Sequence, residues 1–278
     1  MRLSAAVAWA RSRVPRALVP LLVATRARVA WSRAAVREEA RAQMAFLLER
    51  ARPDADLDAV ARDYVRYQAR RGELRWHPEL ITSLRVEGIE HLRAAHDRGR
   101  GVILNFVHHG YYDGGFPSIA RHGFRPHMVV YPYMLEPDAP LWLRQHVAVA
   151  CTGGGRPVSN AVGAAGITDL LRAGEVVAIA SDVPGRTPLT FLGREVLGSF
   201  GAARLAVDAG SPVVVMTSEE DADGPLIRLY EPLEPEAYRS PRPLLERMLA
   251  IHEAVLLCWP EATDLPLSRW GVSESVSP

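Results

Sequence analysis

The segment Gly101–Val107 is a short, largely apolar run that ends abruptly on the imidazole of His108. A second run of this kind, Val176–Ala180, is followed directly by Ser181 and Asp182. Short apolar runs without alternation are typical of strands that are buried on both faces of a sheet. Because such strands occur mainly in parallel sheets covered by helices, these runs constrain the fold more than any other feature of the chain.

Helical and extended patterns alternate along the chain from Val86 onward. A chain of 278 residues is long enough for one such domain with a helical extension. The alternation predicts an α/β fold, a layered and mostly parallel sheet flanked by helices. We expect strands at 102–107, 127–131, 176–180 and 212–217, helices at 88–98, 116–122, 140–149, 162–172, 202–209 and 244–259, and a hairpin turn at Asp223-Gly224.

The first 70 residues or so carry no strand pattern and are expected to be helical. Strong helix formers fill 33–50, Pro53 breaks the pattern, and Asp56 is a candidate cap for a helix that ends near Arg70. We therefore predict three regions: an Arg-rich helical N-terminal segment at 1–54, the main domain at 55–265, and a frayed tail at 266–278.

The N-terminal segment is strongly basic. Residues 1–52 hold eleven Arg against three Glu, a net charge of +8, and an apolar run at 17–25 lies between pairs of arginines. This run is shorter than the roughly 20 residues that a membrane-spanning helix needs. Two interpretations follow: a helix that docks on anionic lipid or on an acidic carrier protein, or a plain helix packed on the domain. The first places the protein peripherally at the cytoplasmic face of the cell membrane.

Several classes of function lack their sequence signals. The chain has no P-loop, dinucleotide glycine fingerprint, internal repeat or basic stripe with interleaved aromatics, so no nucleic-acid partner is expected. Cys151 and Cys258 are too few for a disulfide framework and lack metal-ligand spacing. We expect Cys258 to be a buried, inert thiol, and Cys151 has no obvious activating neighbour that would make it a nucleophile.

His108 and two acids form the candidate site. Asp113 follows His108 by five positions, and Asp182 follows the second apolar strand. Ligands of layered α/β proteins collect beyond the carboxyl ends of the strands, so His108 and Asp182 are expected to converge on one crevice. A neutral imidazole with an acidic partner can take the proton of a hydroxyl, as acyl transfer from a thioester requires. The structural alternative is a hydrogen-bonded core histidine and an aspartate that caps a turn.

Five stretches of the sequence together point to a known family: Gly101–Gly114, Ser181-Asp182, Phe191-Leu192-Gly193, Gly201–Ala206 and Ser211–Val215. They resemble the bacterial lipid A biosynthesis acyltransferase family. That family includes lauroyl and myristoyl transferases and phosphatidylinositol mannoside acyltransferases, within the lysophospholipid acyltransferase superfamily. The resemblance implies a glycerolipid-acyltransferase-like fold at 55–265. It implies transfer of a fatty acyl chain from acyl-coenzyme A or acyl-carrier protein to a lipid or glycolipid hydroxyl, with no cofactor beyond that co-substrate.

The resemblance also implies roles for individual residues. His108 would be the general base, and Asp113 occupies the position of the family's dyad acid. Asp182 matches an acidic position close to the histidine and would share the orienting role. Arg144 and Arg186 would hold a phosphate or an acceptor head group through their planar forks, although surface ion pairs are an equal alternative.

Two glycines, Gly110 and Gly193, belong to the substrate-binding elements that the resemblance implies, and no metal is implied. This chain departs from the family after Gly110, where Tyr111-Tyr112 replaces the usual Asn-Trp pair. The departure leaves the choice of acceptor open.

The same stretch, His108–Gly114, also matches the HHxxxDG signature of nonribosomal-peptide condensation domains and chloramphenicol-acetyltransferase relatives. That match implies His109 as the base, acting on a small-molecule or carrier-bound acceptor. The motif lies before the middle of this chain, and Asp182 has no place in that scheme.

A non-catalytic module that binds a membrane or a carrier protein is a third hypothesis. A metal-dependent hydrolase is a fourth, but adjacent histidines on a strand point to opposite faces and are poor co-ligands.

Overall fold

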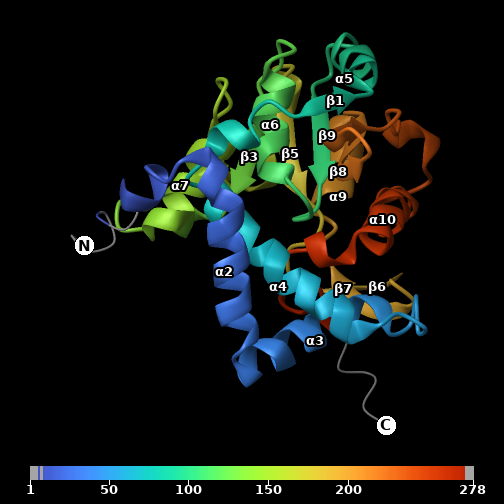
Figure 1. Ribbon diagram of the computed structural model, residues 1–278. Coiled ribbons are helices and arrows are strands. Elements are labelled where there is room, and N and C mark those ends of the chain that lie inside the picture. Colours follow the sequence, from blue (N-terminus) through green and yellow to red (C-terminus); the bar gives the residue numbers. More distant parts are fainter. Residues whose placement is uncertain (1–5, 7–8, 273–278) are drawn as a thin grey trace.

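The computed structural model describes residue 6 and residues 9–272. A seven-stranded sheet forms its centre, in the order β1-β9-β8-β2-β5-β3-β4, and helices lie on both faces (Figure 1). All neighbouring strands are parallel except the β8–β9 hairpin. The predicted α/β class is therefore confirmed. The strands are β1 (Arg85–Glu87), β2 (Val102–Phe106), β3 (His127–Val130), β4 (Pro157–Ser159), β5 (Val176–Ala180), β8 (Val213–Asp221) and β9 (Gly224–Leu229).

The central position of strand β2 explains why its sequence is apolar at every position except the hydrogen-bonded Asn105. Val102, Leu104 and Phe106 pack in the cluster formed with α5 (Ile89–His96), α6 (Tyr112–Ala120) and α7 (Leu141–Ala150). Ile103 and Val107 point to the opposite face and pack in the cluster that includes α8 (Gly163–Arg172), α9 (Gly201–Ala209) and α10 (Pro241–Cys258). Because helices cover both faces, consecutive apolar residues are all buried.

The N-terminal region is helical, as predicted, with α2 (Val19–Trp31), α3 (Ala34–Leu48) and α4 (Leu57–Leu74). The carboxylate of Asp56 accepts hydrogen bonds from two backbone N–H groups of the first turn of α4, so the predicted cap is confirmed. Helix α2 packs on α4, where Arg26 pairs with the buried carboxylate of Glu73. None of the helices in the described part of the chain combines the length and the hydrophobicity needed to cross a bilayer.

The end of the chain is more ordered than its sequence suggested. Helix α11 (Pro266–Arg269) and strand β10 (Gly271–Val272) lie within the predicted tail. Strand β10 pairs with β7 (Arg194–Gly198), which pairs with β6 (Thr187–Phe191) in a small second sheet. Trp270 is buried with its ring 4.5 Å from that of Phe191, and this packing is why the segment does not fray. Residues 273–278 of the predicted tail lie outside the described residues.

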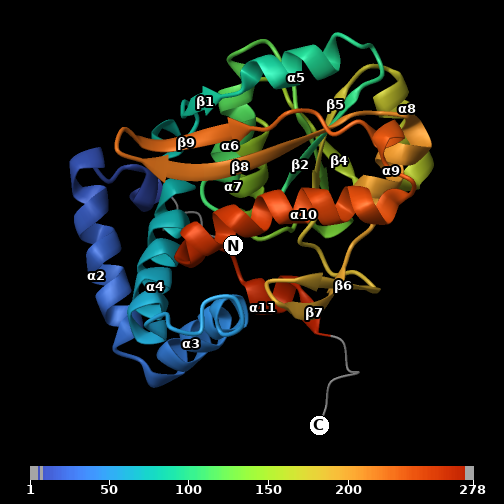
Figure 2. The same cartoon turned by 90° about the vertical axis from the view of Figure 1, so that its right-hand side faces the viewer.

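Helix α10 lies between the central sheet and the small sheet (Figure 2). The hairpin turn predicted at Asp223-Gly224 joins β8 to β9, and Gly224 has a φ of 104°, which glycine adopts without strain. Short 3-10 helices complete the chain at Arg16–Leu18, Pro78–Leu80, Pro132–Met134, Asn160–Val162, Pro235–Ala237 and Pro260–Ala262.

Candidate active site

The ends of strands β2 and β5 bring His108 and Asp182 together. The two strands are parallel neighbours, and Phe106 pairs with Ala180 in register. His108 and Asp182 each follow two residues later, so they leave the sheet side by side at its carboxyl edge. The ring Nδ1 of His108 lies 2.8 Å from Oδ1 of Asp182, and the backbone N–H of His108 donates to Oδ2, also at 2.8 Å. One carboxylate therefore holds both the ring and the backbone of the histidine.

This pairing determines which ring nitrogen of His108 is free. An ionised carboxylate can only accept hydrogen bonds, so we assign the proton to Nδ1 and the lone pair to Nε2. Among the described residues, no group hydrogen-bonds to Nε2, and 17% of the side chain is exposed. Burial lowers the pKa of His108 below 6.5, so the imidazole is neutral at pH 7. It is therefore poised to accept a proton.

The charge of Asp182 is maintained although the residue is buried. Burial alone would raise the pKa of its carboxyl group. The charges on His108 and Arg269, together with the two hydrogen bonds from His108, more than offset burial and lower the pKa to about 2. Nε of Arg269 lies 3.7 Å from Oδ2 of Asp182. The site thus keeps an anion behind the ring at any physiological pH.

The segment that follows α10 forms one wall of the site. The backbone N–H of Asp264 donates to the carbonyl of His108 at 2.8 Å, and that of Gly110 donates to the carbonyl of Ala262 at 3.0 Å. Nη2 of Arg269 donates to the carboxylate of Asp264 at 2.5 Å. Asp264 and Arg269 were not among the predicted site residues, because they lie more than 150 positions after His108 and belong to no motif there. Only the tertiary fold brings them to the histidine.

Asp113 does not orient His108, which corrects the prediction for this residue. It lies in the first turn of α6, and its Oδ2 lies 3.3 Å from Nδ1 of His146 on α7. The start of the helix turns the carboxylate toward α7, and Tyr112 contacts the His108 ring instead, at a centroid distance of 4.7 Å. Burial would raise the pKa of Asp113, but the hydrogen bond and charge of His146 and the charge of Arg71 lower it to about 2.

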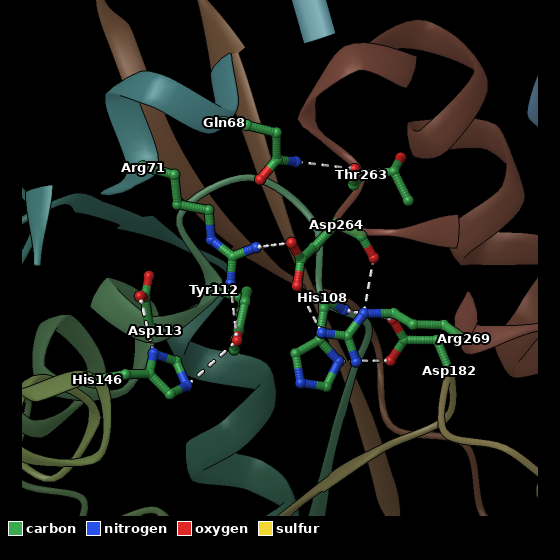
Figure 3. Close-up of polar contacts among 10 residues, drawn as sticks. All are labelled: Gln68, Arg71, His108, Tyr112, Asp113, His146, Asp182, Thr263, Asp264 and Arg269. Carbon is green, nitrogen blue, oxygen red and sulfur yellow. Dashed lines mark hydrogen bonds and ion pairs between the residues drawn. The ribbon is translucent and has the colours of Figure 1, made fainter. Parts of the chain in front are cut away.

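A series of polar contacts joins the two histidine–aspartate pairs (Figure 3). The hydroxyl of Tyr112 lies 3.3 Å from Nε2 of His146 and accepts a hydrogen bond from Nη2 of Arg71 at 2.9 Å. Nη1 of Arg71 lies 2.9 Å from the carboxylate of Asp264, which in turn pairs with Arg269. Both pairs therefore belong to one network of alternating charge at the carboxyl edge of the sheet.

His109, the alternative base, is held in a structural position. Its side chain is buried, and its Nε2 lies 2.8 Å from the carbonyl oxygen of Trp259, to which it must donate. Burial lowers the pKa of His109 to about 4. The adjacent Gly110 has a φ of 59°, and a Cβ there would lie 2.3 Å from Oγ of Ser218. The geometry therefore assigns packing roles to both residues.

The other predicted residues lie apart from the histidine. Arg144 on α7 and Arg186 after β5 are both exposed, and Gly193 forms the turn between β6 and β7. In residues 9–272, no hydrogen bond or ion pair links any of the three to His108. Their roles in substrate binding stay predictions.

The geometry of the described residues supports neither a nucleophilic cysteine nor a metal-dependent hydrolase. Burial raises the pKa of Cys151 to about 11, so the reactive thiolate is disfavoured. Cys258 is exposed on the outer side of α10, and the prediction of a buried thiol was wrong. Across the described part of the chain, no group of three or more potential metal ligands comes together.

An apolar groove of about 750 Å³ lies along α2, α3 and α4. One of its lining residues is Gln68, whose amide donates to the carbonyl of Thr263, the residue before Asp264, at 3.4 Å. His108 is not among its lining residues. The apolar part of the lining consists of Val29, Ala30, Ala35, Val36, Ala40, Tyr64, Val65 and Ala69.

Comparisons with known proteins add little to this geometry. No family model matches the chain, and no curated protein matches it. Among solved structures, it is similar to the 1-acyl-sn-glycerophosphate acyltransferase PlsC of Thermotoga maritima, at 14% identity and a TM-score of 0.41. The match covers 88% of this chain and 95% of that one. A likeness at this TM-score does not indicate a function, and the solved structure is described as an acyltransferase of 1-acyl-sn-glycerophosphate, not of lipid A.

Proposed function

We propose that this chain is a thioester-dependent O-acyltransferase in which His108 is the general base. The observation that carries the proposal is the pair formed by His108 and Asp182, with 2.8 Å between Nδ1 and Oδ1 and with Nε2 free of any described partner. A neutral imidazole oriented by a carboxylate is the arrangement that removes a proton from an attacking hydroxyl.

The reaction needs a group that first accepts a proton and later donates it. Nε2 of His108 takes the proton as the acceptor's hydroxyl oxygen bonds to the thioester carbonyl carbon. The tetrahedral intermediate then collapses, the carbon–sulfur bond breaks, and the imidazolium returns the proton to the leaving thiolate. Asp182 stays ionised throughout and stabilises the imidazolium through the Nδ1–H hydrogen bond. The products are an ester and a free thiol.

The acyl group goes directly to the acceptor in this scheme. In residues 9–272, no serine, threonine or cysteine side chain hydrogen-bonds to His108, whereas a covalent mechanism needs a nucleophile within reach of the base. The geometry therefore favours a single displacement.

Three features support a fatty acyl donor and a lipid or glycolipid acceptor. The apolar groove along α4 suits an alkyl chain and approaches the site at Thr263. The N-terminal segment is rich in arginine, and Leu18, Leu21 and Val29 are exposed on or beside α2. This composition suits peripheral contact with the anionic cytoplasmic face of the cell membrane. Acyl-coenzyme A and acyl-carrier protein are the two donor classes that we propose.

The test is a transfer assay with purified protein, labelled long-chain acyl-coenzyme A or acyl-carrier protein, and total bacterial lipid. We expect label in the lipid fraction, and we expect His108→Ala to reduce the rate by about 10² to 10⁴. His109→Ala should be milder, and the reverse order would favour the HHxxxDG scheme. If no label is transferred from either donor by the folded protein, a non-catalytic binding module is favoured instead.

A further inference from the structure

Two arginines one turn apart, Arg71 in the last turn of α4 and Arg75 at its C-cap, face the same corner of the fold. Arg71 and Arg75 are related as i and i+4, so their side chains leave the same face of the helix. The guanidinium carbon of Arg71 lies 4.9 Å from the centroid of the Tyr112 ring, and that of Arg75 lies 5.2 Å from the Trp142 ring on α7. Two like charges at this spacing repel each other, so the pair costs stability unless an anion compensates it.

Among the described residues, only one of these two cations is in direct contact with a carboxylate. Arg71 is buried and bonds both Asp264 and the hydroxyl of Tyr112. Arg75 is half-buried, and among the described residues it makes no ion pair and no hydrogen bond, only the contact with Trp142. The Nε atoms of Arg71 and Arg75 are both buried without an acceptor. Buried donors are nearly always paired in folded proteins, and charged ones most of all.

The nearby acids are already committed to other groups. The carboxylate of Asp113 accepts from His146 and from the backbone N–H of Gly114. Glu73, on the same helix, pairs with Arg11 and Arg26. Burial and the charge of Arg71 lower the pKa of Arg75, and the charges of Asp113, Tyr112 and Asp264 offset this only in part. An anion in direct contact with Arg75 would stabilise its charged form further. This corner therefore has a guanidinium Nε on each of Arg71 and Arg75 that lacks an acceptor.

We propose that Arg75, supported by the charge of Arg71, binds the phosphate group of a substrate, a role that rests on the acyltransferase function proposed above. A guanidinium fork matches phosphate oxygens in a bidentate geometry. Trp142 holds the fork by cation–π stacking and so reduces the entropy lost on binding.

The corner is placed to align a substrate with the base. Tyr112 bonds Arg71 through its hydroxyl and contacts the His108 ring through its own ring, at 4.7 Å between centroids. Arg75 itself interacts electrostatically with Tyr112. In this proposal, the substrate extends from a phosphate on Arg75, past Tyr112, to a hydroxyl or thioester at Nε2. The phosphate belongs either to a phospholipid acceptor or to the phosphorylated pantetheine arm of the donor.

Direct binding of inorganic phosphate tests the site without any assay of activity. Isothermal titration at constant ionic strength compares the wild-type chain with Arg75→Gln and with Arg66→Gln, an exposed arginine of the same helix that pairs with Asp63. We expect Arg75→Gln to weaken phosphate binding by at least about tenfold, Arg75→Lys to recover part of it, and Arg66→Gln to have no effect. Equal affinity in wild type and Arg75→Gln, with circular dichroism showing both folded, would overturn the proposal.

Kinetics then identify the source of the phosphate. If the donor supplies it, Arg75→Gln raises the KM for acyl-coenzyme A at least about tenfold and leaves the KM for an acyl-pantetheine without phosphate unchanged. If the acceptor supplies it, only phosphorylated acceptors show the rise. Loss of phosphate binding in Arg75→Gln in a protein that transfers no acyl group would uphold the anion site and refute the acyltransferase. Acyl transfer without any effect of Arg75→Gln on KM or on phosphate binding would uphold the acyltransferase and refute the anion site.

Discussion

The chain contains two histidine–aspartate pairs that differ in what the second ring nitrogen does. In one pair, His108 and Asp182 lie 2.8 Å apart, and Nε2 of the histidine has no described partner. In the other, His146 and Asp113 lie 3.3 Å apart, and Nε2 of the histidine lies 3.3 Å from the hydroxyl of Tyr112. The acids are alike, since both have a pKa lowered to about 2.

The difference teaches that a carboxylate beside an imidazole is insufficient to define a base. A general base needs a lone pair that a substrate can reach. The pair at the strand ends leaves that lone pair free, whereas the pair between α6 and α7 uses both ring nitrogens within the fold. We therefore assign proton transfer to the first pair and structural organisation to the second.

The largest expected effect is a difference in transfer rate when the same substitution is made at each of the two histidines. His108→Gln should lower the rate of acyl transfer by about 10² to 10⁴, because no other described group replaces the base. His146→Gln should lower it by less than about tenfold. Initial rates with labelled donor measure both, and thermal melts show that each variant is folded. Equal losses in the two folded variants would contradict the comparison.

The acids provide the second contrast. Asp182→Asn should lower transfer by about 10² or more, because an amide can present an N–H to the ring and stabilise the wrong tautomer. Asp113→Asn should act on stability instead and lower the free energy of unfolding by about 2 kcal/mol, since it weakens a buried charged hydrogen bond. Urea unfolding at pH 7 provides that value. A stable Asp113→Asn protein with strongly reduced transfer would reverse the assignment.

The pH profile sharpens the comparison further. The active form of His108 is neutral and its pKa is lowered by burial, so kcat/KM should fall with decreasing pH only below pH 6.5. Asp182 raises the pKa of His108, so Asp182→Asn should move this acid limb to lower pH in its residual activity. His146→Gln should leave the limb where it is. A limb that follows His146 would show that the wrong histidine has been assigned.

The smallest effect is expected where the two pairs meet. Tyr112→Phe removes the hydroxyl that accepts from Arg71 and contacts His146, but it keeps the ring against His108. We expect a loss of about 1 kcal/mol in the free energy of unfolding and a change of transfer rate within about threefold. Chemical denaturation and the labelled-donor assay measure the two quantities. A rate loss of 10² or more would mean that the pairs act as one unit.

Much of the scaffold follows from local pattern. The apolar runs predicted β2, β5 and β8, and the helical periodicity predicted α3, α4 and α7 to α10 within a few residues. Asp56 as a cap and Asp223-Gly224 as a turn were also predicted from residue chemistry alone. The prediction missed β1, β4, β6, β7 and β10, and it gave no bounds for β9, which the predicted hairpin turn implies. Several of these are short edge strands, and all owe their strand state to the neighbour they pair with.

The candidate site divides in the same way. Two apolar strands that each end on a polar residue were sufficient to predict that His108 and Asp182 meet, because the carboxyl ends of parallel neighbours share one edge of a sheet. Because Asp113 lies five positions after His108, the sequence also suggested a contact between these two residues. Helix α6 prevents this contact by turning the aspartate toward α7.

The sequence by itself thus determined the α/β scaffold and the meeting of one histidine with one acid, because strand periodicity and strand-end position are local properties of the chain. Only the tertiary structure decided that Nε2 of His108 is free, that Asp113 belongs to His146, and that Arg269 and Asp264 complete the site. Side-chain partners that are dozens to hundreds of positions apart depend on how helices pack against the sheet, and no local pattern specifies that packing.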